Sequence, residues 1–381
     1  MATANINTAM LSWARKRSRY SVAEFASKLG VTEERLIQWE SGVQNMTFNQ
    51  ASNFAEKAHI PFGYLFLAKP PVEALPIPDL RTPDSQPVQQ PSAELLDLVK
   101  LMLQRQEWYR EYLQQQLAEP NPFVGRFSVR SNSSDIVKDI RNSLRVEPYP
   151  TRGNSDDYYR GLVSRIESLG ILVMRQSSLG HFTRPLLVSE FRGFAITDEY
   201  APIIFVNHAD APGARLFTLI HELCHIWIGQ SGISDGDTLA SRKEEVLCNA
   251  VAAEFLVPAD EFSQIWNDDT DDWQTNLAPL EMHFRVSRWV LARRALTLKL
   301  ISYNDYAQYI AKLHTEWNER EKSDKGGPNY YRTKNAQISP SFSRAVVGQA
   351  LSGQLLLREA SVLLDGIKPA KISVFAKELG I

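Results

Sequence analysis

Residues 221–225 read His-Glu-Leu-Cys-His, and this pentapeptide constrains the fold more than any other segment of the chain. Two histidines four positions apart lie on one face of an α-helix, so both imidazole rings can reach the same metal ion. The glutamate after the first histidine is then placed to take a proton from a water molecule at that ion. The pentapeptide therefore predicts a helix that carries part of a metal site.

The flanking residues predict that this helix is largely buried. The segment 202–207 is a short apolar run typical of a strand, Asp210 is expected to cap the next helix, and Pro212 fits its first turn. Few positions from 215 to 228 are polar, and Gly229 is expected to end the helix. Because unpaired polar groups in such a helix would be costly, a bound metal explains them better than ordinary core packing does.

A catalytic zinc site needs three protein ligands and one open position. The next predicted helix begins near Ser241, ends at Pro258, and offers Glu244, Glu245 and Glu254. Glu245 is the preferred ligand, because small residues on its face would let the two helices approach closely. Glu244 points about 100° away and is expected in solvent, and Glu254 is the runner-up.

These two helices resemble those of the ImmA/IrrE family of zinc metallopeptidases, in which a His-Glu-x-x-His helix precedes a Glu-x-x-x-Asn-x-x-Ala-Ala-x-x-x-x-Pro helix. The resemblance covers roughly residues 155–300. It implies a zincin-like core with Zn²⁺, or another divalent ion such as Mn²⁺, on His221, His225 and Glu245. It also implies Glu222 as the general base, and specific intracellular proteolysis, often of a repressor, rather than bulk digestion.

Residues 13–67 have the pattern of a helix-turn-helix domain and resemble the Xre/Cro-type repressor fold. In that fold the second helix reads DNA. Two glutamates at the start of this helix, Glu33 and Glu34, oppose phosphate, so a protein partner in place of DNA stays open. The expected DNA-binding residues are Arg15, Lys16, Arg17, Arg19, Thr32, Arg35 and Gln38.

The length of 381 residues predicts two or three domains, and the predicted elements indicate a mainly α protein with a small β-sheet, of the α+β class. The net charge of −2 confines any nucleic-acid contact to a local patch. The expected parts are an all-α helix-turn-helix domain at 1–69, a proline-rich linker at 70–91, a metallopeptidase domain at 92–300 with its core at about 155–260, and a helical C-terminal region at 301–381.

No apolar run reaches membrane-spanning length and no signal-type apolar core opens the chain, so we expect a cytoplasmic protein. The two cysteines, Cys224 and Cys248, exclude a disulfide scaffold and are expected as buried thiols, with Cys248 as an alternative neighbour of the metal.

Three further segments of the sequence allow predictions about packing and binding. An aromatic cluster around Trp108 in the predicted helix 92–118 is expected to pack within the chain, with a homodimer contact as the alternative. The strands predicted at 171–174, 193–197 and 202–207 form a sheet whose edge could hold a substrate peptide by strand addition. In the segment 282–301, Ser287 is expected to cap a helix whose basic residues form either a solvated face or a surface that senses nucleic acid; these are Arg288, Arg293 and Arg294.

The leading hypothesis is a zinc-dependent endopeptidase with a DNA-binding regulatory domain. It would make a specific cut in an intracellular protein such as a helix-turn-helix repressor or a toxin–antitoxin component. The alternative is a transcriptional regulator or antitoxin-like partner whose metal site is structural. An open fourth metal position favours the enzyme, and a fourth protein ligand such as Cys248 favours the alternative.

Overall fold

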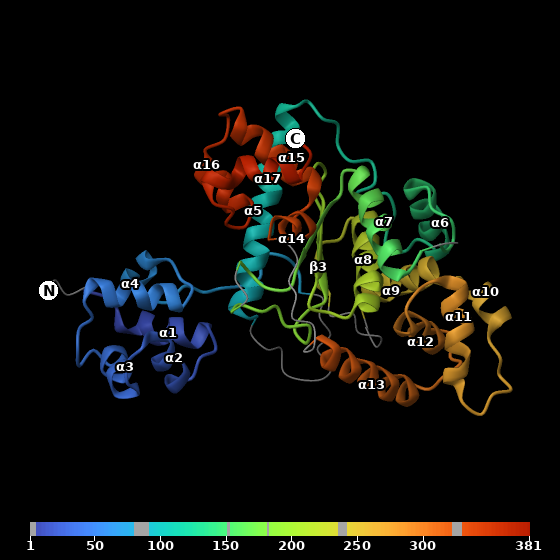
Figure 1. Cartoon of the computed structure of the whole chain (residues 1–381), viewed down its shortest axis with the longest axis horizontal. Coiled ribbons are helices and arrows are strands. Elements are labelled where there is room, and N and C mark those ends of the chain that lie inside the picture. The colour runs from blue at the N-terminus through green and yellow to red at the C-terminus, as the bar shows by residue number, and fades with distance from the viewer. Residues whose placement is uncertain (1–4, 80–90, 151–152, 181–182, 235–241, 322–329) are drawn as a thin grey trace. The chain divides into compact units, whose positions relative to one another are not determined.

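The computed structural model describes residues 5–79, 91–150, 153–180, 183–234, 242–321 and 330–381. The chain divides into two compact units, one of residues 1–76 with 88–99 and the other of residues 77–87 with 100–381. Helices predominate, and the strands form one small mixed sheet, which confirms the expected α+β class (Figure 1).

The first unit is built from short capped helices. Ser21 and Glu24 form a capping box, and the Thr32 hydroxyl accepts a hydrogen bond from the backbone N–H of Arg35. Ile37 is 52% exposed and lies outside the core of this unit. The helices are α1 (Thr8–Arg17), α2 (Val22–Leu29), α3 (Glu33–Glu40), α4 (Phe48–Lys57) and the 3-10 helix η1 (Phe62–Phe66).

The sheet lies in the second unit and has the order β1-β3-β2-β4. β1 (Leu172–Gln176) runs parallel to β3 (Ile203–Asn207), whereas β2 (Gly193–Ile196) is antiparallel to both of its neighbours. The fourth strand, β4 (Gly232–Ser234), was not predicted, because three residues are too few to show an alternating pattern.

Helix α8 (Pro212–Trp227) packs against β2 and β3, and α9 (Lys243–Leu256) packs along α8 (Figure 1). The expected cap of α8 is wrong: its N-cap residue is Ala211, and no side chain caps the helix. The Asp210 carboxylate instead accepts a hydrogen bond of 2.7 Å from Arg192, so it is held by an ion pair.

The described parts of the chain contain further helices. They are α5 (Ala93–Gln115), α6 (Ser133–Leu144), α7 (Ser155–Ser168), α10 (Ala259–Ile265), η2 (Trp273–Asn276), α11 (Leu277–Phe284), α12 (Arg288–Thr297), α13 (Tyr303–Glu321), α14 (Tyr330–Gln337), α15 (Pro340–Leu351), α16 (Leu357–Leu363), η3 (Pro369–Lys371) and α17 (Ile372–Glu378). Helix α13 ends at Glu321, and residues 322–329 lie outside the described residues.

The C-terminal helices are anchored to the sheet side of the second unit. Trp108 and Tyr109 of α5 pack on Phe342 of α15, at ring-centroid distances of 5.6 and 5.9 Å, so the aromatic cluster packs within the chain as expected. The buried Glu167 carboxylate of α7 accepts a hydrogen bond of 2.9 Å from the Ser339 hydroxyl at the start of α15. Burial raises the pKa of Glu167, and the hydrogen bonds that its carboxylate accepts from Val173, Ser339 and Ser341 offset part of the increase.

The predicted linker makes an unexpected contact with the sheet. The backbone N–H of Ile233 in β4 donates a hydrogen bond of 3.1 Å to the carbonyl of Pro78, and Asp79 forms a parallel bridge with Ile233. Residues 80–90 of the predicted linker lie outside the described residues. Among the helices that are described, none has the length and apolar character needed to cross a membrane.

Candidate metal centre

Helices α8 and α9 bring three potential metal ligands together. The Nε2 atoms of His221 and His225 are 3.2 Å apart, and the carboxylate oxygens of Glu245 lie 3.2 Å from the first and 3.1 Å from the second. All three residues are at most 2% exposed. The two expected histidines and the preferred glutamate are therefore neighbours, and among the described residues they form the one cluster of this kind.

The spacing of these atoms fits a metal ion. A tetrahedral ion with ligand bonds of about 2.0–2.1 Å would hold its ligand atoms about 3.3 Å apart. The donor set of two imidazoles and one carboxylate is also one that zinc accepts. The three groups are taken out of water and face one another, and a shared cation would satisfy all of them at once.

The packing of α9 on α8 makes this convergence possible. Small side chains on α9 are buried, among them Ala252 and Ala253. Cys224 of α8 and Cys248 of α9 are free, buried thiols, as expected. Burial, together with the neighbouring Cys224, raises the pKa of Cys248 well above its ordinary value. Cys248 does not belong to the cluster that the described ligand atoms form, so it is no fourth ligand there.

The Glu222 carboxylate lies beside the cluster and is fully buried. Neither of its oxygens makes a hydrogen bond with a residue that the structure describes. Burial, and then the charge of Glu245, raise the pKa of Glu222 well above its usual value, which the nearby Ser234 hydroxyl offsets in part. A buried carboxylate without a partner next to a potential metal site is suited to a water molecule or a substrate group.

Two residues of the sheet shape the site and were not predicted from the sequence. The Ser234 hydroxyl of β4 donates a hydrogen bond of 3.3 Å to Glu245. Gly193 of β2 pairs with Ser234, and a Cβ atom at Gly193 would lie 2.9 Å from Glu222 Oε1. A glycine inside a strand often marks such a close approach, so Gly193 carried a signal, whereas Ser234 carried none.

A second layer supports His221. The Oδ1 atom of Asn249 lies 3.2 Å from His221 Nδ1 and accepts a hydrogen bond of 2.9 Å from Arg293. The Arg293 guanidinium also lies 3.9 Å from the centre of the Phe217 ring. An Nδ1–H of His221 directed at Asn249 leaves the Nε2 lone pair for a metal.

The arginines of α12 were expected on a solvated face or on a face that senses nucleic acid. For Arg293 and Arg294 both expectations are wrong, because each of these residues is only 4% exposed. Arg294 forms an ion pair with Glu254, which removes the runner-up ligand from the metal site. Glu244 is half-buried and not fully solvated, and it lies outside the cluster.

The expected DNA-binding residues of the first unit fall into two groups. Arg15 and Arg17 are committed to intrachain carboxylates: Arg15 pairs with Glu40 at 2.7 Å, and Arg17 pairs with Glu73 and Asp97 at 2.6 Å each. These carboxylates neutralise the two guanidiniums, and the expected role of Arg15 and Arg17 as phosphate ligands stays a prediction.

The other group is at least partly accessible. Lys16, Arg19 and Gln38 are exposed, Thr32 caps α3, and Arg35 lies 5.9 Å from the centre of the Trp39 ring.

Fold and centre together define a class: an α+β domain with a His-Glu-x-x-His helix and a carboxylate from the next helix, an arrangement typical of metallopeptidases. Residues 166–296 match the M78 peptidase family, described as an IrrE N-terminal-like domain, and include all four residues of the centre. This match supports the resemblance to ImmA/IrrE-type peptidases. Residues 338–378 match a family described as a domain of unknown function (DUF8813). No curated protein and no solved structure matches the chain.

Proposed function

We propose that this chain is a zinc-dependent endopeptidase whose metal ligands are His221, His225 and Glu245. The observation that carries the proposal is the convergence of their donor atoms, 3.1–3.2 Å apart, beside a buried carboxylate without a partner, Glu222. When bound, a divalent ion supplies positive charge that polarises a scissile carbonyl and makes water easier to deprotonate.

Each residue of the chain then has a role. Glu222 takes a proton from the attacking water and passes it to the leaving amine. Asn249 orients His221, and Ser234 orients Glu245 through the contacts described above. The walls formed by β2 and β4 exclude bulk water from the Glu222 carboxylate.

An extended substrate would add to the outer edge of β4. This edge is close to the centre, because Ser234 of the same strand contacts Glu245. It also pairs with a strand-like segment in the structure, residues 78–79 of the predicted linker. That segment would have to leave before a substrate could bind there, which fits a restrained protease better than a digestive one.

The regulatory part of the proposal concerns the first unit. We propose that the domain at 1–69 binds DNA through its accessible residues, and that the substrate is a cytoplasmic regulator such as a helix-turn-helix repressor or a toxin–antitoxin component. A gel-shift experiment would compare Lys16→Glu with Glu33→Gln. Weaker binding by the first and equal or stronger binding by the second would support DNA recognition. Unchanged binding by both would favour a protein partner.

The peptidase proposal is tested by separating metal binding from turnover. Glu222→Gln should keep the metal and reduce cleavage by about 10²–10⁴-fold, whereas His225→Ala should lose metal by elemental analysis. Glu244→Gln is the matched control, since Glu244 lies on α9 outside the cluster. Full cleavage by Glu222→Gln would refute the assignment of the base.

A second candidate is favoured by the nearly complete burial of the three ligands, which is typical of structural metal sites. In this case the chain is a helix-turn-helix regulator or an antitoxin-like partner, and the metal stabilises its fold. Binding of a hydroxamate to the metal-loaded protein distinguishes the two candidates, because it requires an open metal position.

A further inference from the structure

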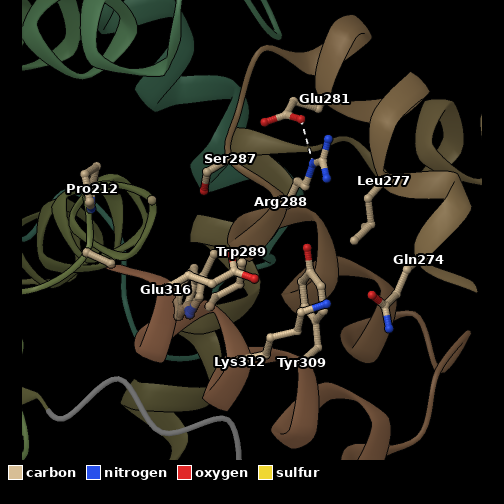
Figure 2. A pocket seen from close by; sticks show the side chains of 13 residues that line it. Pro212, Gln274, Leu277, Glu281, Ser287, Arg288, Trp289, Tyr309, Lys312 and Glu316 are labelled. Carbon is tan, nitrogen blue, oxygen red and sulfur yellow. Dashed lines mark hydrogen bonds and ion pairs between the residues drawn. The ribbon is translucent and has the colours of Figure 1, made fainter. Parts of the chain in front are cut away.

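A cavity of about 540 Å³ lies where the start of α8, the start of α12 and one side of α13 meet (Figure 2). It is separate from the metal centre, but aromatic rings connect the two. Trp289, which lines the cavity, packs edge-on against Phe217 at 5.9 Å, and the Phe217 ring lies 6.4 Å from that of His221. A group bound in the cavity would therefore be near any chain held at the metal.

Two hydrogen-bond donors of the lining have no partner among the described residues. They are the hydroxyl of Ser287 and the indole N–H of Trp289, and both atoms are buried. Trp289 is only 6% exposed. A buried donor left without a partner is destabilising, so an acceptor that enters the cavity would offset this loss.

Ser287 shows that the arrangement is not an ordinary helix cap. It occupies the N-cap position of α12, as expected, but its side chain makes no capping hydrogen bond. The hydroxyl lies instead against the first turn of α8, where a Cβ atom at Gly213 would be 1.8 Å from Ser287 Oγ. The hydroxyl therefore lies between two helix starts.

Those two helix starts favour a negative ligand. Neither α8 nor α12 has a side-chain cap, and Pro212 and Arg288 at their first positions both line the cavity. Each helix N-terminus carries a partial positive charge of about half an elementary charge. An anion between them gains from both, as anions at helix N-termini commonly do.

The charged side chains of the lining favour a single negative charge over a double one. Arg288 is paired with Glu281 at 2.8 Å, and Lys312 and Glu316 lie one helical turn apart on α13. These four side chains sum to no net charge, so a phosphate dianion would meet two carboxylates without a surplus of cations. A carboxylate carries about half that charge, which the partial positive charges of the two helix ends and the two donors can match.

We propose that this cavity binds the carboxylate of an acidic side chain within a polypeptide. That the polypeptide is the substrate rests on the proposed peptidase function. His221 is nine positions beyond Pro212 on α8, which corresponds to about 14 Å along the helix axis. About four residues of extended chain cover that length, so the acidic residue lies about four positions from the scissile bond.

The test measures binding without turnover. A blocked peptide of about eight residues with one glutamate, and its glutamine analogue, are titrated into the full-length Glu222→Gln protein by calorimetry. We expect the glutamate peptide to bind at least tenfold more tightly. Ser287→Ala and Trp289→Phe should each reduce this preference several-fold, and Met282→Ala, which changes an exposed side chain of α11 outside the lining, should keep it. Ser287→Ala removes one oxygen and keeps the test valid if Trp289→Phe fails to fold.

Equal binding of the two peptides would overturn the proposal. The proposal would also be overturned if inorganic phosphate or a single-stranded oligonucleotide bound more tightly than the glutamate peptide and Ser287→Ala abolished that binding. Failure of the peptidase proposal gives a different result, because the glutamate peptide would then bind with its preference but no peptide would be cleaved by the wild-type protein. Cleavage without any preference for glutamate would reject the cavity alone.

Discussion

Replacement of Gly193 by alanine tests how the sheet positions Glu222. A Cβ atom at this position would lie 2.6 Å from Thr218 Cγ2, 2.8 Å from the Phe205 carbonyl oxygen and 2.9 Å from Glu222 Oε1. All three distances are shorter than an ordinary contact of 3.4–4 Å. The added methyl must therefore push β2 away from α8, displace the carboxylate, or do both.

The structure gives the size of both effects. Overpacking of this kind lowers the free energy of unfolding by about 1–3 kcal/mol. An ordinary contact would require Glu222 Oε1 to move by about 0.5 Å, and a misplacement of 1 Å costs about 10²-fold in rate. We therefore expect Gly193→Ala to lower the melting temperature and to reduce kcat about tenfold, while the metal content stays near that of the wild type.

Two controls separate these effects. Gly161 lies inside α7, and a Cβ atom there would meet nothing within 4 Å, so Gly161→Ala should stabilise the protein by about 0.5–1 kcal/mol. Combining Gly193→Ala with Thr218→Ser removes the nearest methyl, and should restore part of the stability but little of kcat. Calorimetry and steady-state cleavage measure the two quantities. A Gly193→Ala protein with unchanged melting temperature and kcat would refute the account of this wall.

Three further predictions follow from contacts of the second unit. Asn249→Ala removes the partner of His221 Nδ1 and should weaken metal binding by about 10–100-fold in a chelator competition, whereas Asn249→Asp should keep it. Burial, followed by the charge of Arg215, lowers the pKa of His208 from 6.5 to about 3. Between these two pH values the unfolded chain binds a proton at His208 and the folded protein does not, so the free energy of unfolding falls as the pH drops from 6.5 towards 3. His208→Gln should remove this contribution, so its melting temperature should rise relative to that of the wild type as the pH falls, and a constant difference would contradict the assignment. Ile77 is buried next to Pro78, so Ile77→Glu should release residues 78–79 from β4 and speed amide exchange at Ile233. Cleavage should also accelerate if substrates use that edge of the sheet. Val72→Glu, at a 98% exposed position, is the control.

The two core helices of the site could be predicted because their signals are local. The pattern around His221 and His225 repeats with the helical period, and Glu245 shares its helix with small residues that allow close packing. Each signal lies within about four helical turns. The position of α8 on the sheet then needed only the neighbouring strands, β2 and β3, which were also predicted.

The sequence could not show ion pairs and burial that depend on partners far along the chain. Arg17 was expected to contact phosphate, and the sequence gave no sign that it pairs with Glu73 and Asp97, which are 56 and 80 residues away. Arg293 was placed on a surface because arginines are rarely fully buried. It is buried because Asn249 accepts its hydrogen bond and Phe217 covers its guanidinium. Neither partner could be inferred from the residues around the arginine.

The contact between the predicted linker and β4 combines a local sequence signal with a distant partner. Pro78 has no backbone N–H, so it offers β4 only its carbonyl, and the bridge at Asp79 is isolated and not part of a longer ladder. Such a contact is weak enough for a polypeptide with a full set of backbone donors to replace it. It still occupies the strand that carries Ser234 towards Glu245. The proline-rich segment was expected to separate domains and was a candidate for restraining the protease. The missing N–H of Pro78 makes the segment a partner that a competing strand can displace from this edge.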